Sequence, residues 1–310
     1  MTNRVRSRVC VLLATYNGEG YLEQQLASIL WQVGVDVEVF VRDDGSTDGT
    51  MDLIRAACAR ESRIHLVSDN AVANTGLPTK AFFRLFGLVD FSSFDFVALA
   101  DQDDVWLPDK LSRLIDAVDG SGADGCSSNL FSFSESGFCS LVRKTREVRE
   151  LDYLFQGASA GCTYLLSREF AQRVAARFGH TSIARDLPRN ASHDWLIYAL
   201  SRGCGGQWVM TDYPSVLYRQ HARNVYGARG GFSGFVSRVK MLRSGWLFEN
   251  VLFLQSVVQS SVLHQRVFSA VRRLRFRDRI WLAANAHRFR RESSSVIVLA
   301  CYFLFGSKLR

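Results

Sequence analysis

Several features that would assign this 310-residue chain to other protein classes are missing from its sequence. Its seven cysteines are scattered and odd in number, and no two of them stand at C-x-x-C spacing. The sequence therefore indicates neither a disulfide framework nor a zinc knuckle, and a reducing cytosol fits it best. The basic start of the chain is followed by an apolar run that is too short for a signal-peptide core, so we expect no export.

Long apolar runs are lacking as well. The stretch 293–306 is apolar over about a dozen residues, whereas a membrane-spanning helix needs about 20. The sequence contains no G-x-G-x-x-G and no Walker loop, which argues against dinucleotide and ATP enzymes. It also contains no zinc-finger, bZIP or RNP-like pattern, so we expect no nucleic-acid partner.

Basic charge is concentrated in the last quarter of the chain. Residues 226–310 hold 15 lysines and arginines against three acidic residues, whereas the rest of the chain is slightly acidic. In the segment 272–281, arginines are interleaved with Leu274, Phe276 and Ile280, which is typical of a helix at an anionic membrane surface. A solvated basic helix face is the simpler alternative. We expect a helical basic extension that makes a peripheral membrane contact, in the cytoplasm at the inner membrane.

Strand-like and helix-like segments alternate over the first two thirds of the chain. Apolar runs that end in polar residues, as buried parallel strands do, cover residues 9–16, 37–44, 63–69 and 94–101. Segments with apolar residues at helical spacing cover residues 21–30, 47–60, 80–89 and 108–118. The alternation predicts an α/β fold, in which a doubly wound sheet is flanked by helices.

Polar and acidic residues gather where three of the predicted strands end. They are Thr15, Tyr16, Asn17 and Glu19 after the first strand, Asp43 and Asp44 after the second, and Asp101, Asp103 and Asp104 after the fourth. Ligands bind outside the carboxyl ends of such strands, so we expect these side chains to share one crevice. A solvated turn would explain any one of these clusters by itself. So many carboxylates in one crevice repel one another, and a cation is needed to offset their charge. Mg²⁺ or Mn²⁺ bound to a diphosphate suits them.

Three motifs in this order resemble the nucleotide-sugar-binding half of the family 2 glycosyltransferases with the GT-A fold: "LLATYNGEGYLEQQLASIL", "VRDDGSTDGT" and "ALADQDDVWLPDKL". The form "DQDDVWLPDKL" is closest to the rhamnosyltransferase-like members. The resemblance implies a glycosyltransferase domain over residues 1–225, with a donor half at about 8–120 and an acceptor half at about 121–225. The extension 226–310 follows. The implied activity is sugar transfer from a nucleoside diphosphate donor, with a divalent metal and inversion at the anomeric carbon.

The resemblance also implies roles for residues at the strand ends. The implied nucleotide-binding residues are Thr15, Tyr16, Asn17, Glu19, Asp43 and Asp101, with Thr15 and Tyr16 at the base and Asp43 at the pyrimidine imide. The implied ligands of Mn²⁺ or Mg²⁺ are Asp101 and Asp103, from the D-x-D motif, and His221. A lone histidine is also common as a structural residue. Asn74 matches a further Asn-x-Gly segment, a type of turn that is common without ligands.

An inverting transfer needs a base that takes the proton of the attacking acceptor hydroxyl. The segment His193-Asp194-Trp195 precedes an apolar helical run and is similar to the H-D-W of rhamnosyltransferase-like members, which implies that Asp194 is this base. Capping of the helix is the alternative role. The resemblance further implies that Gly161, Cys162 and Trp195 contribute to acceptor binding, while a small buried sulfur is the simpler interpretation of Cys162.

The resemblance thus implies an inverting, metal-dependent glycosyltransferase that moves L-rhamnose from dTDP-L-rhamnose to a hydroxyl of a growing cell-surface glycan, with a glycan or a lipid-linked glycan as the acceptor. A UDP-hexose is the alternative donor. A distant alternative is a serine hydrolase, because residues 157–161 fit G-x-S-x-G around Ser159, and Asp194 and His221 follow in triad order. That motif needs a strand directly before the serine and a helix directly after it, whereas residues 162–166 resemble a strand.

Overall fold

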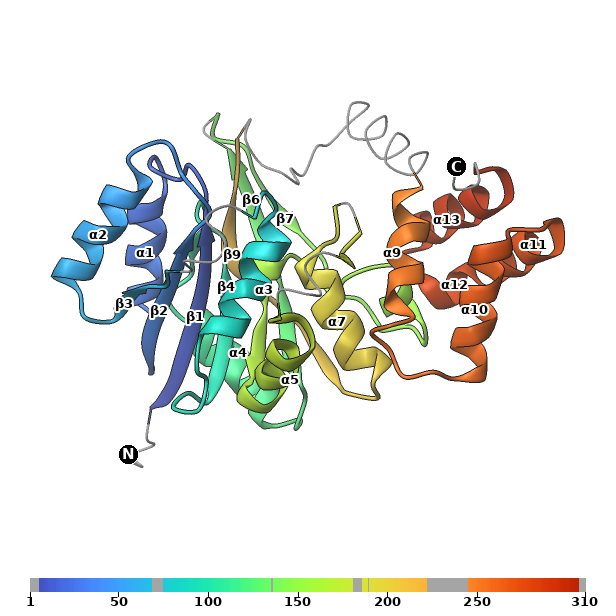
Figure 1. Ribbon diagram of the computed structural model, residues 1–310, viewed down its shortest axis with the longest axis horizontal. Helices are drawn as coiled ribbons and strands as arrows, with labels where there is room; N and C mark the ends of the chain where they lie inside the picture. Colours follow the sequence, from blue (N-terminus) through green and yellow to red (C-terminus); the bar gives the residue numbers. More distant parts are fainter. Residues whose placement is uncertain are drawn as a thin grey trace. The chain divides into compact units, whose positions relative to one another are not determined.

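The computed structural model describes residues 6–68, 75–134, 136–180, 186–188, 190–221 and 245–306 (Figure 1). The chain forms two compact units. The first consists of Met1–Thr145, Ser159–Arg185 and Gln207–Asn224, and the second of Arg146–Ala158, Asp186–Gly206 and Val225–Arg310. The second unit therefore includes two segments from the range that the sequence assigns to the glycosyltransferase domain. The functional boundary at residue 225 stays a prediction.

The first unit is built around one mixed sheet with the strand order β3-β2-β1-β4-β8-β6-β9-β5, in which β7 also pairs with β6. The strands are β1 (Ser7–Thr15), β2 (Val35–Asp43), β3 (Ile64–Leu66), β4 (Phe96–Ala100), β5 (Val105–Trp106), β6 (Gly125–Ser134), β7 (Cys139–Val142), β8 (Leu165–Ser167) and β9 (Trp208–Gln220). Strands β1 to β4 run parallel, while β8 is antiparallel to both of its neighbours. The predicted α/β fold class is confirmed, with a parallel half and a mixed half.

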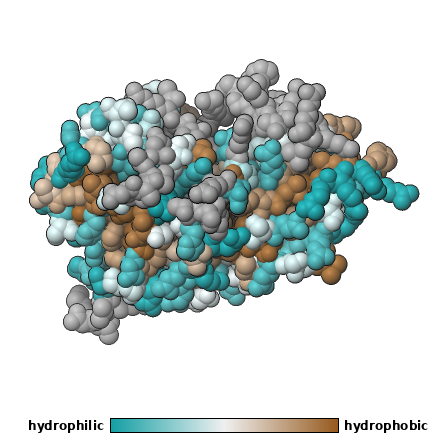
Figure 2. Space-filling view, in the orientation of Figure 1, coloured by the Kyte–Doolittle hydropathy of each residue, from teal (hydrophilic) through white to brown (hydrophobic). Residues whose placement is uncertain are grey.

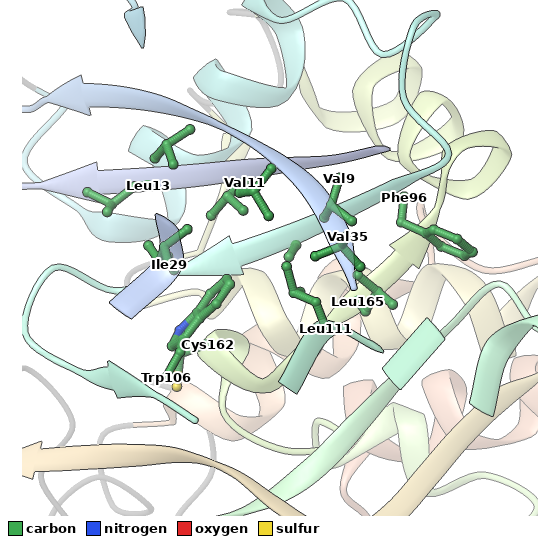
Figure 3. Close-up of a cluster of buried hydrophobic side chains, with 14 of the residues drawn as sticks. Val9, Val11, Leu13, Ile29, Val35, Phe96, Trp106, Leu111, Cys162 and Leu165 are labelled. Carbon is green, nitrogen blue, oxygen red and sulfur yellow. The ribbon is translucent and has the colours of Figure 1, made fainter. Parts of the chain in front are cut away.

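Helices cover both faces of this sheet (Figure 1). One face carries α1 (Leu22–Leu30), α2 (Thr50–Arg60) and α4 (Lys110–Asp119), and the other carries α3 (Pro78–Leu88) and α5 (Arg168–Phe178). Alternate residues of a strand point to opposite faces, so Val9, Val11 and Leu13 of β1 all join the core under the first group of helices (Figure 3). On the other face, Phe83 of α3 stacks on Phe178 of α5 with ring centroids 4.5 Å apart.

Two glycines allow α3 and the end of α5 to approach closely. A Cβ atom on Gly87 would lie 2.3 Å from the carbonyl oxygen of Gly179, and a Cβ atom on Gly179 would lie 2.7 Å from the Cα atom of Gly87. Side chains do not fit at these distances without a shift of the backbone. The packing of this face of the sheet therefore depends on both glycines.

The described part of the second unit is helical. Its elements are the short 3₁₀ helix η1 (Asp152–Leu154) and the helices α7 (His193–Gly203), α9 (Trp246–Leu254), α10 (Val262–Arg273), α11 (Phe276–Ala284), α12 (Ala286–Phe289) and α13 (Ser293–Phe305). The helices predicted for the C-terminal extension are thus present in residues 245–306. No helix within the described ranges has the length and apolarity that crossing a membrane requires.

A buried ion pair joins distant segments of the second unit. Asp152 is fully buried, the hydroxyl of Tyr198 in α7 donates a hydrogen bond to its Oδ1 atom at 2.9 Å, and Arg291 lies 3.6 Å from its Oδ2 atom. The guanidinium of Arg291 also donates hydrogen bonds to the carbonyl oxygens of Gly157 and Ala158. Burial raises the pKa of Asp152, while Arg291 and Tyr198 oppose that shift. The C-terminal helices are thereby connected to α7.

Substitution of Gly87 by alanine tests the close approach of α3 and α5. Helix propensity alone would make Gly87→Ala stabilising by roughly 0.5–1 kcal/mol. Because the added methyl group meets Gly179, we expect a loss of about 1–3 kcal/mol in the free energy of unfolding, measured by urea denaturation. Gly120→Ala, whose Cβ atom would lie 3.6 Å from the carbonyl oxygen of Asp116, is the control. A gain in stability for Gly87→Ala would contradict the packing.

Candidate active site

Hydrogen bonds tie the ends of β1 and β2 to each other. Asp43 at the end of β2 accepts bonds from the backbone nitrogens of Gly45 and Ser46 at 3.0 and 2.8 Å, which closes a tight turn. Asn17, with a φ of 50°, donates its backbone nitrogen to Ser46 Oγ and accepts from the backbone nitrogen of Thr47, both at 2.8 Å. The structure therefore brings Asn17 and Asp43, two predicted nucleotide-binding residues, to one turn. Their contact with a nucleotide stays a prediction.

Glu19 also lies at this edge of the sheet, next to the start of α2. Its carboxylate accepts a hydrogen bond from the backbone nitrogen of Gly49 at 3.0 Å, where the dipole of α2 favours negative charge. Asp48 accepts a hydrogen bond from the backbone nitrogen of Thr50, the first residue of α2, at 3.1 Å. The observed bonds of Glu19 are structural, and its role in nucleotide binding stays a prediction.

Asp44 is paired inside the protein and contributes little negative charge to the crevice. Arg42 and Asp44 are both buried, and the guanidinium lies 2.7 Å from the carboxylate. The backbone nitrogen and hydroxyl of Thr75 each donate to Asp44 at 2.8 Å, and the backbone nitrogen of Gly76 donates at 3.1 Å. An arginine therefore offsets one of the carboxylates for which the sequence suggested a metal. Asn74 lies outside the described residues.

Gln102, the middle residue of the D-x-D motif, holds the end of β1, and sequence analysis gave it no role. Its Oε1 atom accepts hydrogen bonds from Thr15 Oγ1 at 2.6 Å and from the backbone nitrogen of Tyr16 at 2.8 Å, while its Nε2 atom donates to the carbonyl oxygen of Tyr16 at 3.0 Å. A Cβ atom on Gly18 would lie 2.4 Å from Oε1, so these hydrogen bonds of Gln102 require a glycine at position 18. The side chain of Tyr16 remains half exposed, as the stacking of a nucleotide base on its ring would require.

Asp103 and His221, two of the predicted metal ligands, lie side by side. The Nε2 atom of His221 is 2.7 Å from Oδ2 of Asp103, and the ring of Tyr21 stacks on the imidazole with centroids 4.8 Å apart. The antiparallel pairing of β5 with β9 explains how residues so far apart in sequence meet. Arg219, just before His221, donates from Nε to the carbonyl oxygen of Asp103 at 3.0 Å and fixes the loop.

Asp104 is buried beneath this pair. Its Oδ1 atom accepts a bond from the backbone nitrogen of Arg219 at 3.3 Å, and the thiol of Cys162 lies close enough to interact with the carboxyl group. The Oδ2 atom makes no regular hydrogen bond among the described residues. Burial, and then the charges of Asp101 and Asp103, raise the pKa of Asp104 well above its usual value. Ligand atoms of Asp101, Asp104 and Cys162 lie within 4.8 Å of one another. A buried carboxyl oxygen without a partner is costly unless a proton or a cation satisfies it.

These side chains form a donor set that fits a hard divalent cation. Aspartate oxygens and one imidazole suit Mn²⁺ and Mg²⁺. The structure pairs Asp103 with His221 and groups Asp101 with Asp104 and Cys162, and metal binding by Asp101, Asp103 and His221 together stays a prediction. Burial, with Asp104 and Asp101 nearby, raises the pKa of the Cys162 thiol well above its usual value. Sulfur is also a soft ligand, whereas Mn²⁺ and Mg²⁺ prefer oxygen. The predicted burial of Cys162 is confirmed.

A buried lysine that the sequence did not reveal supports the adjacent segment. Lys110, at the start of α4, donates from Nζ to the carbonyl oxygen of Cys162 at 2.5 Å and lies 3.2 Å from the ring centroid of Trp106. Desolvation lowers the pKa of Lys110 to about 7. Gly161 and Cys162 belong to the 3₁₀ helix η2 (Gly161–Thr163) and are buried. Their role in acceptor binding stays a prediction.

Asp194 lies in the first turn of α7, in the second unit. Ser192 Oγ and the backbone nitrogen of Trp195 both donate hydrogen bonds to its Oδ1 atom, the latter at 2.7 Å. Trp195 is buried and donates a hydrogen bond from Nε1 to the carbonyl oxygen of Tyr153 at 2.7 Å. Its backbone lies close to Gly157, where an added Cβ atom would be 3.4 Å from the Cα atom of Trp195. The helix start is thus rigidly held. Catalysis by Asp194 and acceptor binding by Trp195 stay predictions.

The serine hydrolase alternative is not favoured by the surroundings of Ser159. Residues 151–160, all of them described, contain no strand, although the hydrolase motif needs one directly before its serine. Ser159 is buried and donates its hydroxyl to the carbonyl oxygen of Ser128 at 2.9 Å. His221, the candidate base of a triad, lies against Asp103 instead.

Comparisons with known proteins identify the family. The family model described as glycosyl transferase family 2 matches residues 10–163. RfbG of Shigella flexneri, a dTDP-rhamnosyl transferase, is 34% identical over 241 residues, which cover 77% of this chain and 82% of RfbG. The chain belongs to glycosyltransferase family 2. This glycosyltransferase is also 26% identical to the succinoglycan biosynthesis protein ExoO of Rhizobium meliloti, over 76% of this chain and 64% of ExoO.

Solved structures share the fold of this family 2 glycosyltransferase. TarS of S. aureus in complex with UDP-GlcNAc superposes with a TM-score of 0.59 at 13% identity, over 91% of this chain and 82% of that one. The mannosyltransferase PcManGT of Pyrobaculum calidifontis, in complex with GDP-Man and Mn²⁺, superposes with a TM-score of 0.54 at 15% identity. The match covers 98% of this chain and 77% of that one. The predicted GT-A type of fold is confirmed. Membership of the family makes this chain an enzyme that transfers a glycosyl group from a nucleotide sugar.

The buried Lys110 predicts a pH dependence of stability. The unfolded chain keeps this lysine protonated up to about pH 10.4, whereas the folded protein releases the proton near pH 7. Between these values the unfolded chain binds more protons, so the stability of the wild type relative to Lys110→Met should rise with pH, by at most about 1.4 kcal/mol per unit. Urea titrations at pH 7 and pH 9 measure this difference in the free energy of unfolding. Lys80→Met, at a partly exposed site, should show no such rise, and equal behaviour of both variants would refute the prediction.

Proposed function

We propose that this enzyme transfers L-rhamnose from dTDP-L-rhamnose, with inversion at the anomeric carbon, to a hydroxyl of a growing cell-surface glycan. The observation that carries the proposal is the similarity to RfbG, a dTDP-rhamnosyl transferase, over 82% of the length of that protein. The name of ExoO, a succinoglycan biosynthesis protein, supports a polysaccharide acceptor. A UDP-hexose is the alternative donor.

The donor diphosphate would bind at the carboxyl ends of β1, β2 and β4. A divalent cation held by Asp101, Asp103 and His221 would neutralise the diphosphate and stabilise the charge of the leaving group. Arg219 fixes the backbone of Asp103, and its guanidinium also donates to Gln24 Oε1 at 2.5 Å, so this loop is ordered before the donor arrives. The half-exposed ring of Tyr16 would stack on the base, with Thr15 held behind it by Gln102.

The acceptor hydroxyl would be activated by Asp194. As a carboxylate, Asp194 can take the hydroxyl proton while the oxygen attacks the anomeric carbon and the bond to the diphosphate breaks. Its hydrogen bonds with Ser192 and the backbone of Trp195 fix the carboxylate at the start of α7. The pairing of Tyr198 with Asp152 anchors the same helix one turn further along. A lipid-linked acceptor would bring the enzyme to the cytoplasmic face of the inner membrane as a peripheral protein.

Calorimetric titration with dTDP and UDP, with and without Mn²⁺, tests the donor site. We expect Mn²⁺-dependent binding of dTDP, and Asp103→Asn should weaken it at least tenfold, or by about 1.4 kcal/mol, because a metal ligand is lost. Asp119→Asn, an exposed aspartate at the end of α4, is the matched control and should bind as the wild type does. Tighter binding of UDP would favour the UDP-hexose donor. Binding that is equal with and without metal would refute the proposed metal site.

Asp194→Asn separates chemistry from donor binding. Removal of the base should lower kcat by about 10²- to 10⁴-fold, because proton transfer from the acceptor is lost. Calorimetric affinity for dTDP and Mn²⁺ should not change, since the variant keeps the shape of the side chain. The rate is measured as dTDP release in the presence of acceptor. Asp186→Asn, an exposed aspartate of the second unit, serves as the control, and a kcat within threefold of the wild type for Asp194→Asn would exclude it as the base.

A further inference from the structure

Helix α13 is apolar from Val296 to Phe305, after three serines, yet several of these apolar side chains are exposed to solvent. It contains no charged residue between Ser293 and Phe305. Leu299, Tyr302 and Phe303 are buried, whereas Ile297 is 65% exposed and Phe305 is 83% exposed. Exposed apolar surface of this kind marks contact with a membrane or with another protein.

The exposed side chains of α13 form one continuous stripe. Ile297, Cys301, Leu304 and Phe305 are exposed and recur at positions i, i+4, i+7 and i+8, which lie on one side of a helix. The 13 residues of α13 extend over about 20 Å, whereas the apolar core of a bilayer is about 30 Å thick. The stripe can therefore lie along a membrane surface, and the helix cannot cross it.

Helix α11 adds further apolar surface next to α13. Phe276 is 76% exposed and Ile280 is 46% exposed, and the two are one helical turn apart. The two helices pack on each other, and the guanidinium of Arg279 donates to the carbonyl oxygen of Phe303 at 2.8 Å. Figure 2 shows hydrophobic and hydrophilic residues alternating at the surface in the region of α11 and α13.

The charge around these helices is mostly positive, and Glu292 at the start of α13 is the one exposed acidic side chain within residues 262–306. Phe276 lies between the exposed side chains of Arg275 and Arg277, and Arg272 and Arg273 are exposed at the end of α10. The one acidic residue of α11, Asp278, is buried and paired with Arg266 and Arg273. A second copy of the chain would bring like charges together on this face, whereas anionic headgroups complement it.

We propose that α11 and α13 form the surface by which this enzyme lies on an anionic phospholipid bilayer. The side chains of Phe276, Ile297 and Phe305 enter the boundary between headgroups and acyl chains, while Arg275 and Arg277 bind lipid phosphates. The inference rests on the proposed peripheral location of the enzyme and assigns that contact to particular residues.

Sedimentation with vesicles tests the surface on the full-length protein. We expect the wild type to pellet with vesicles of phosphatidylglycerol and phosphatidylcholine more than with phosphatidylcholine alone. The double variant F276S/F305S should partition at least tenfold more weakly, and R275Q/R277Q should lose the preference for phosphatidylglycerol. Phe138→Ser, at a 63% exposed site of the first unit, is the matched control and should pellet as the wild type does.

Two exposed cysteines provide a test within unmodified protein. Cys301 lies in the stripe of α13 and Cys139 lies in β7 of the first unit, and both are exposed. Anionic vesicles should slow the reaction of Cys301 with a membrane-impermeant maleimide at least fivefold and leave Cys139 unaffected. Mass spectrometry of peptides from each site gives both rates in one sample.

The proposal is overturned if F276S/F305S pellets like the wild type, or if vesicles leave the rate at Cys301 unchanged. It is also overturned if ultracentrifugation shows a wild-type dimer that F276S/F305S converts to a monomer while vesicle binding persists, because a second copy then covers the surface. Titration of each variant with dTDP and Mn²⁺ is an independent measurement on the first unit. If membrane contact fails while nucleotide binding is intact, only this surface is refuted. If nucleotide binding fails while membrane contact is intact, only the proposed glycosyl transfer is refuted.

Discussion

Mutual repulsion of the carboxylates in the loop after β4 is the constraint on which the rest of the first unit depends. Three aspartates within four positions, two of them largely withdrawn from water, cannot all carry full charge without compensation. The fold offsets them in different ways. His221 lies against Asp103, burial raises the pKa of Asp104, and the buried cation of Lys110 lies close enough to interact with Asp104 and Asp101. The divalent cation proposed for this site would offset the charge that remains.

A two-residue strand makes this compensation possible. β5 follows the loop directly and pairs with β9, which carries Arg219 near its end and leads to His221. One short antiparallel pairing therefore delivers both the histidine beside Asp103 and the guanidinium that holds its backbone. Without that pairing, the aspartates would face each other across an unsupported loop.

Sequence patterns predicted the features that depend on local periodicity and on strand ends. They predicted the alternating strands and helices of residues 9–118 and the nearness of Asp103 and His221, the latter through resemblance to a family. They did not reveal the hydrogen bonds of Gln102 to residues 15 and 16 or the burial of Lys110, because a partner chosen by the fold leaves no spacing signature. The pairing of Asp44 with Arg42 was also missed, although residues two apart on a strand point to the same face. For the same reason, the grouping of α7 with helices formed by residues 245–306 could not be derived from composition.

The ion pair of Asp152 and Arg291 has a consequence for the order in which the chain folds during synthesis. The segments of the second unit that are made first, η1 and α7, find the buried guanidinium of Arg291 only after α9 to α12 have been translated. Until Arg291 appears, Asp152 lacks its ion-pair partner, although Arg202 of α7 also acts on its charge, and the carbonyl oxygens of Gly157 and Ala158 lack their donor. The strands of the first unit can pair while translation continues. The second unit, which includes the helix that bears Asp194, is completed only when the segment of Arg291 has been made, so a shorter nascent chain with a formed sheet still lacks it.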